Sequence, residues 1–86
     1  MGKPNWTEIE QMKVVWNIVD RGLLRTEVRS EERVTLRKKI AIDLLNDPDF
    51  SNRHSAEKPQ DTVEQHINAW LGYIEGTREK KPPRVM

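Results

Sequence analysis

One stretch near the C-terminal end, TVEQHINAWLGYI at residues 62–74, constrains the fold more than any other. Its apolar residues follow one another at helical intervals: Val63, Ile67, Trp70, Leu71 and Ile74. This spacing is typical of a helix that buries one face and leaves the other in water. Thr62 and Gln65 have the spacing of a capping box, so we expect a helix over residues 62–75, ended by Gly76.

A first helix is predicted over residues 7–21. Thr7 and Glu10 repeat the capping-box spacing, and Gly22 suits the left-handed position that follows many helices. The stripe expected to face the core consists of Ile9, Met12, Val15, Trp16 and Val19, widened by Val14 and Ile18.

A middle helix is predicted over residues 31–46. Ser30 suits its N-cap, and two glutamates follow in the first turn, where the helix dipole favours acids. Pro48 ends the helix, because proline disfavours helical backbone in the residue before it. The side chains expected in the core are Val34, Ile40, Ala41, Leu44 and Leu45.

The remaining segments are polar and contain no stretch of alternating hydrophobicity long enough for a strand. Residues 51–60 are expected to form a polar loop, with Phe50 as a lid on the core. Residues 1–5 are expected to be a disordered N-terminus and residues 77–86 a basic flexible tail. The fold predicted for residues 6–76 is therefore all-α, a small orthogonal three-helix bundle.

Charge and residue types exclude several classes of function. The 15 Lys and Arg residues nearly balance the 14 acidic residues, and this is evidence against a strong non-specific grip on phosphates. The chain has no cysteine, two histidines and no phosphate-binding or nucleophile motif, so we expect no enzyme activity, no metal and no cofactor. No apolar run has the length of a membrane span, so no membrane partner is expected.

Three short motifs occur in the order found in a known family. Trp6-Thr7 with Glu10 is similar to a W-T-x-x-E opening, and Ile40-Ala41 with Leu44 is similar to I-A-x-x-L. Thr62, Gln65 and Trp70 match T-x-x-Q-x-x-x-x-W. On these motifs the chain resembles the Myb/SANT family of three-helix domains, with Arg37 where the family's second tryptophan would stand and a longer gap between the last two helices.

The resemblance implies a helix-turn-helix variant, also related in shape to homeodomains, whose third helix lies in the major groove of double-stranded DNA. It implies a monomeric, nuclear DNA-binding module of a transcription or chromatin protein. The family's third-helix asparagine matches Asn68, and we expect Glu64, Gln65 and His66 beside it at base edges. Phosphate contacts are expected from the basic residues of the middle helix, the loop and the tail. The predicted DNA-binding residues are Arg37, Lys38, Lys39, Arg53, Lys58, Glu64, Gln65, His66 and Asn68.

Two other functions remain open. No Lys or Arg lies between Pro59 and Thr77, and neutral third helices are typical of SANT modules that bind histone tails or other subunits. In that alternative the partner would contact Tyr73, Glu64 and His66. A helical scaffold or oligomerisation piece is the third reading, and an exposed Trp16 would support it. The sequence places DNA binding slightly ahead of protein interaction.

Overall fold

The computed structural model of this chain describes residues 6–76. Three α-helices, α1 (Glu8–Asp20), α2 (Glu31–Leu45) and α3 (Pro59–Glu75), are linked by two 3₁₀ segments, η1 (Leu23–Arg25) and η2 (Pro48–Ser55). The prediction of an all-α domain is confirmed, since the residues described are in helices and turns with no strand. The predictions for residues 1–5 and 77–86 lie outside the described residues.

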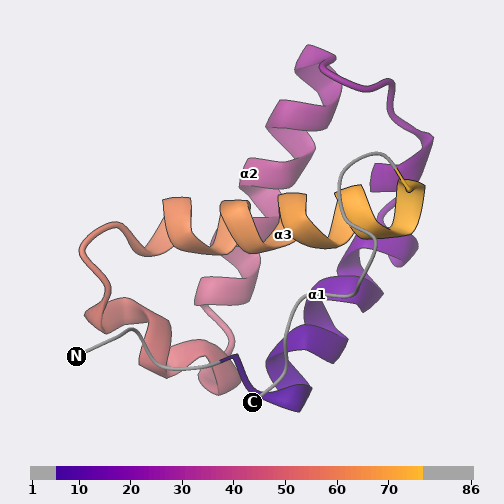
Figure 1. The fold of residues 1–86 in the computed structure, drawn as a ribbon. Helices are drawn as coiled ribbons and strands as arrows, with labels where there is room; N and C mark the ends of the chain where they lie inside the picture. Colours follow the sequence, from indigo (N-terminus) through magenta and orange to yellow (C-terminus); the bar gives the residue numbers. More distant parts are fainter. Residues whose placement is uncertain (1–5, 77–86) are drawn as a thin grey trace.

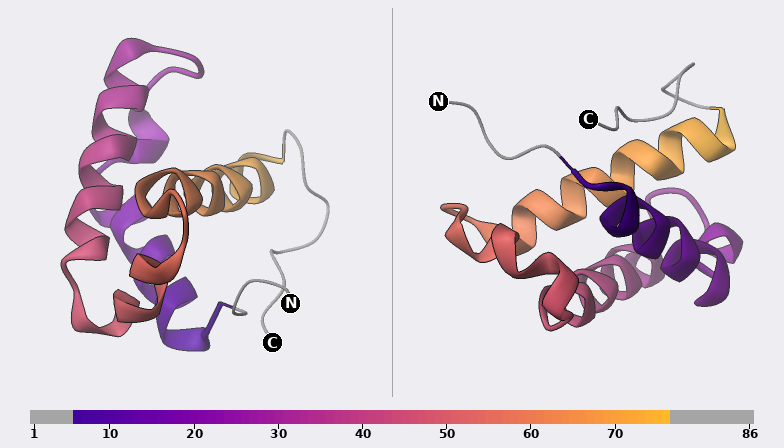
Figure 2. Two further views of the ribbon diagram at one scale, coloured as in Figure 1. Left: turned by 90° about the vertical axis from the view of Figure 1, so that its left-hand side faces the viewer. Right: turned by 90° about the horizontal axis from the view of Figure 1, so that it is seen from below.

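Helices α2 and α3 cross at a steep angle, and α1 packs beneath the crossing (Figure 1). The two side views show η2 leading from the C-terminal end of α2 to the start of α3 (Figure 2). A buried ion pair fastens the opposite ends of these helices, because Arg33 at the start of α2 lies 2.7 Å from the carboxylate of Glu75 at the end of α3. The ion pair therefore adds a polar contact between the two helices at one end of the crossing.

Local sequence sets the helix starts. The Thr7 side chain accepts a hydrogen bond from the Glu10 backbone N–H at 3.1 Å, and the Glu10 carboxylate accepts one from the Thr7 N–H at 2.8 Å. This is the capping box predicted for α1. The Ser30 hydroxyl accepts from the Arg33 N–H at 3.1 Å and caps α2.

The connection between α2 and α3 differs from the polar loop predicted for residues 51–60. Asp47 accepts a hydrogen bond from the Asp49 N–H and starts η2, which continues to Ser55. Helix α3 then begins at Pro59, since proline fits the first turn of a helix, where no N–H is needed. Thr62 therefore lies inside α3 and does not cap it.

The core lies where the three helices and η2 meet. Phe50 is fully buried at its centre and is more than the lid expected from the sequence. The buried apolar side chains are Val14, Ile18, Leu23, Ile40, Ala41, Leu44, Phe50, Val63, Ile67 and Leu71. Trp70, predicted as a core residue, is partly buried against this cluster, and Ile74 is 38% exposed.

Helix α1 turns a different face to the core than the one predicted. Val14 and Ile18, expected only to widen the stripe, are completely buried, whereas Trp16 is 69% exposed. The physical reason is the capping glutamate. Glu10 is pulled into the interior by a buried arginine of η2, and Val14 and Ile18 follow at steps of four residues on the same side of the helix.

Candidate functional site

The polar face of α3, predicted to read base edges, is bonded to α2. Arg37 donates from Nη1 to the Asn68 side-chain oxygen at 3.2 Å and from Nε to Glu64 at 3.4 Å. Gln60, one turn before Glu64, donates to the other carboxylate oxygen at 3.0 Å. Asn68 and Glu64 are half-buried in this network, so their acceptor oxygens already hold an internal partner.

Gln65 is the one predicted base-reading residue of α3 that is exposed, and it donates a 3.3 Å hydrogen bond to Asp61 on the same helix. The neighbouring acid at position 61 adds negative charge to the surface that was expected to meet DNA. Together with Glu64, the face is acidic and amide-rich. It contains no cation of its own.

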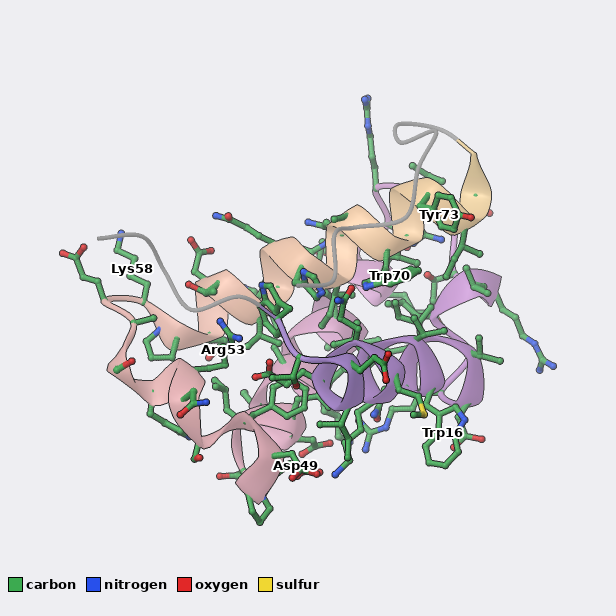
Figure 3. The ribbon with its side chains drawn as sticks, turned by 60° about the horizontal axis from the view of Figure 1, so that its bottom comes forward. Trp16, Asp49, Arg53, Lys58, Trp70 and Tyr73 are labelled. Carbon is green, nitrogen blue, oxygen red and sulfur yellow. The ribbon has the colours of Figure 1, made fainter. Side chains whose placement is uncertain are left out.

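The lysines predicted to hold phosphates are exposed, and two of the three point away from this face. Lys38 and Lys39 follow Arg37 on α2, and each residue step turns a helix by about 100°. Since Arg37 faces α3, the two lysines point away from it. Lys58, just before α3, lines a shallow pocket with Gln60, Asp61 and Glu64, so it lies at the edge of this face and remote from Trp16 on α1 (Figure 3).

Arg53, predicted to contact phosphate, is instead an interior residue. Its side chain is 3% exposed and grips Glu10 with two hydrogen bonds, of 2.8 Å from Nε and 2.9 Å from Nη2. Its guanidinium carbon also lies 4.0 Å from the centre of the Trp6 ring. Figure 3 shows Arg53 directed from η2 toward the body of the protein. An arginine that neutralises a buried carboxylate cannot leave it without a large cost, so the fold does not present Arg53 at the surface where a phosphate contact was predicted.

His66, predicted at a base edge, is also buried. Its ring stacks on Trp6 with 3.9 Å between ring centres and 7° between planes. Burial and the nearby positive charge of Arg53 lower the pKa of His66 to about 4. His66 is therefore neutral at physiological pH, and it is unavailable both to DNA and to the protein partner that the SANT alternative placed on it.

The Glu10 carboxylate completes this interior cluster. Burial by itself would raise the pKa of Glu10, but the hydrogen bonds from Arg53 and from the Thr7 backbone outweigh it and hold that pKa below its usual value. The charges of Glu10 and Arg53 neutralise each other. The cluster that they form with Trp6 and His66 therefore has a structural role and joins α1, η2 and α3. Sequence reasoning missed it, since Glu10 and Arg53 are 43 residues apart.

A groove of about 660 Å³ lies between α2 and α3 and is lined in part by Val28, Val34 and Leu71. Arg33 and Arg37 also line it, but they are bonded to Glu75 and to Asn68. These two arginines thus hold the two helices together.

A different surface is left without an internal role. The outward side of α1 presents four apolar residues at intervals of three, four and three, namely Ile9, Met12, Trp16 and Val19, and all four are exposed. We call this set the outer α1 face. Figure 3 shows Trp16 pointing away from the body, on the side of α1 opposite α3. The sequence contained this signal, because α1 has apolar residues on two opposite sides and the core uses one of them.

No family model, curated protein or solved structure matches this chain. The Myb/SANT resemblance thus rests on its three short motifs alone. Within residues 6–76, no helix has both the length and the apolarity needed to cross a bilayer. The same residues hold no group of three or more His, Asp or Glu side chains arranged for a metal ion.

Proposed function

We propose that this chain is a protein-interaction module whose binding surface is the outer α1 face. The observation that carries the proposal is Trp16, a large aromatic side chain that is 69% exposed among the apolar residues of this face, with Asp20 beside it at the C-terminal end. Tryptophan is among the residues that contribute most to binding at protein interfaces. Contiguous exposed apolar patches are uncommon on monomeric proteins. Where they occur, they often mark interaction sites.

The geometry of α3 also favours protein interaction over DNA binding. Two of the nine predicted DNA contacts, Arg53 and His66, are buried, and Arg37 donates hydrogen bonds to two others, Glu64 and Asn68. A recognition helix needs free donors and acceptors at its surface. The ranking drawn from the sequence is therefore reversed in this proposal, and the interaction surface moves from α3 to α1.

Site-specific photo-crosslinking tests the proposal. A benzophenone amino acid in place of Trp16 is expected to form covalent protein adducts in cells that produce the chain. The same amino acid in place of Val28, which is 61% exposed on another part of the surface, is the matched control and is expected to form few. Equal yields at the two positions, or no adducts at either, would contradict an interface on α1.

DNA binding remains the second candidate function, favoured by one observation. Lys38 and Lys39 are both exposed on α2, and neither makes an ion pair in the described part of the chain. Exposed, unpaired lysines suit phosphate contacts, and the Myb/SANT resemblance supports the same function. The nuclear location expected from the sequence goes with this candidate.

Fluorescence anisotropy with a labelled duplex tests this second candidate. Binding at about 50 mM salt is expected, and changing both lysines to alanine should reduce the slope of log K against log salt by about 2. Arg25→Ala, which removes an exposed basic residue of η1 outside the predicted DNA contacts, is the control and should leave the slope nearly unchanged. No binding at low salt would remove the candidate.

A further inference from the structure

Helix α1 has two apolar faces on opposite sides, and only one is covered in the described structure. Val14 and Ile18 are completely buried in the core. At about 100° per residue, the outer α1 face is turned away from them by roughly half a revolution. A helix that is apolar on both sides is normally buried on both sides. The outer α1 face is therefore a surface that lacks its partner.

The charges near this face are placed outside it. Lys13 lies on its flank, but its ammonium group is held 2.7 Å from Asp47 and 2.6 Å from Asp49. These contacts draw the lysine toward η2 and away from the outer α1 face. An occupant can consequently be apolar along the middle of the helix, while Asp20 lies beside Trp16 and Val19 at its C-terminal end.

We infer that the occupant is a second copy of this chain, with the two α1 helices packed antiparallel about a twofold axis near residue 14. The inference rests on the proposed function, and it names the partner. It replaces the monomer expected from the family resemblance. A twofold interface requires a surface that is complementary to itself.

The outer α1 face meets that requirement. Its spacing of three, four and three is the same in both directions, with β-branched residues at its ends and large flexible or aromatic residues between them. Antiparallel pairing sets Ile9 against the partner subunit's Val19, and Met12 against the partner subunit's Trp16. The second contact occurs twice and joins a thioether to an aromatic ring, which is a favourable pairing.

The helix dipoles also favour the antiparallel orientation. Two antiparallel helices bring the positive end of each dipole to the negative end of the other. Glu8 and Asp20 lie on opposite flanks of the outer α1 face, and a twofold axis across the helices sets each flank against itself. The two acids therefore do not meet across the interface. A parallel pair would place the two Glu8 carboxylates at the same end.

The size of the face agrees with a weak dimer. A fully exposed tryptophan presents roughly 250 Å², so Trp16 alone offers roughly 170 Å² for burial. The four side chains together amount to a few hundred Å² per copy, which for two copies is below the roughly 1,200 Å² of the smallest standard interfaces and in the range of transient ones. We expect a reversible monomer–dimer equilibrium.

Sedimentation of the full chain over a range of concentrations tests the inference. The wild type is expected to pass from monomer to dimer, and Trp16→Glu is expected to raise the dissociation constant by about 30-fold or more. Val28→Glu, which adds the same charge at an exposed apolar residue elsewhere, is the matched control and should dimerise like the wild type. A wild type that is monomeric at every concentration would overturn the inference.

Engineered cysteines test the orientation, since the chain has none of its own. Oxidation of a mixture of Ile9→Cys and Val19→Cys chains should give the mixed disulfide, whereas each variant alone should stay uncrosslinked. Disulfides formed by each variant alone, without the mixed product, would contradict the antiparallel arrangement.

Acrylamide quenching separates failure of the inference from failure of the proposed function. The difference in fluorescence between the wild type and Trp16→Phe isolates the signal of Trp16. If the chain is monomeric and Trp16 is quenched freely, the second copy is excluded and the face stays open to a different protein. If the chain is monomeric and Trp16 is shielded, the chain itself covers the face, and the inference and the proposed function both fail.

Discussion

The buried histidine of α3 gives the protein a stability that depends on pH. His66 is stacked on Trp6 beside the Arg53 guanidinium, and its burial, followed by the charge of Arg53, lowers its pKa to about 4 in the folded state. In the unfolded chain the pKa of a histidine is about 6.5. Between about pH 4 and pH 6.5, the imidazole of His66 is therefore protonated in the unfolded state and neutral in the folded state. Stability is complete above about pH 6.5 and falls as the pH drops toward 4.

The size of the effect follows from the two pKa values. A difference of about 2.5 units corresponds to about 3 kcal/mol when the interval is crossed completely, and about 2 kcal/mol is lost between pH 7 and pH 5. The carboxylates of Glu10 and Glu75 also have lowered pKa values, mainly through hydrogen bonds from arginines in opposition to burial. Their contribution is lost at lower pH, near and below the usual pKa of a free glutamate, so pH 7 to 5 reports mainly on His66.

Urea unfolding followed by circular dichroism measures the free energy of unfolding across this range. The wild type is expected to lose about 2 kcal/mol from pH 7 to pH 5. His66→Phe keeps a flat ring against Trp6 and removes the titrating group, so its stability should be nearly constant over the same interval. His54→Gln changes the exposed histidine and should leave the His66-dependent loss in place. An equal pH dependence in His66→Phe and in the wild type would refute the reasoning.

Three further predictions concern single side chains. Arg53→Met leaves the Glu10 carboxylate buried without its partner and should cost about 3–5 kcal/mol in urea unfolding; a stable variant would contradict the interior pair. Trp16→Ala should change stability by less than about 0.5 kcal/mol at concentrations where the chain is monomeric, whereas Phe50→Ala should cost about 3–5 kcal/mol. Similar losses for these two aromatic residues would show that α1 is oriented differently. Asn68→Ala removes one hydrogen bond from α2 and should cost about 1 kcal/mol by the same assay, with no loss of helix by circular dichroism.

The sequence was sufficient to predict where helices occur, because the necessary signals are local. The Thr7 capping box, the Ser30 cap and the glycines after α1 and α3 act within a few residues of where they stand. The start of α3 was misplaced for an equally local reason. Thr62 and Gln65 imitate a capping box inside the helix, and Pro59 is the residue that begins it.

The orientation of α1 could not be predicted from periodicity alone. Two sets of apolar residues lie on opposite sides of this helix, and a pattern count favours the larger set, which contains Met12 and Trp16. The deciding interaction joins Glu10 to Arg53 across 43 positions. A charged residue in a capping box is normally assigned to the surface, so the pattern offered no indication that this glutamate is internal.

The Glu10–Arg53 pair also explains why the residues predicted to bind DNA do not all lie on the surface. Arg53 and His66 are of residue types that bind nucleic acids when exposed, and burial is a property of the whole fold. Arg37 and Asn68 were both singled out from the sequence, and the structure does bring them together. They meet each other, however, and so stabilise the crossing of α2 and α3.

The central claim is that the outer α1 face is exposed in the monomer and covered by a partner. Paramagnetic relaxation of the tryptophan indole N–H groups by a soluble gadolinium chelate tests it most directly, with Trp70, whose indole nitrogen is buried, as the internal control. In dilute solution the Trp16 N–H should relax strongly and the Trp70 N–H weakly, and at high concentration Trp16 should become protected as well. Protection of Trp16 in dilute solution, or its strong relaxation at every concentration, would contradict the account.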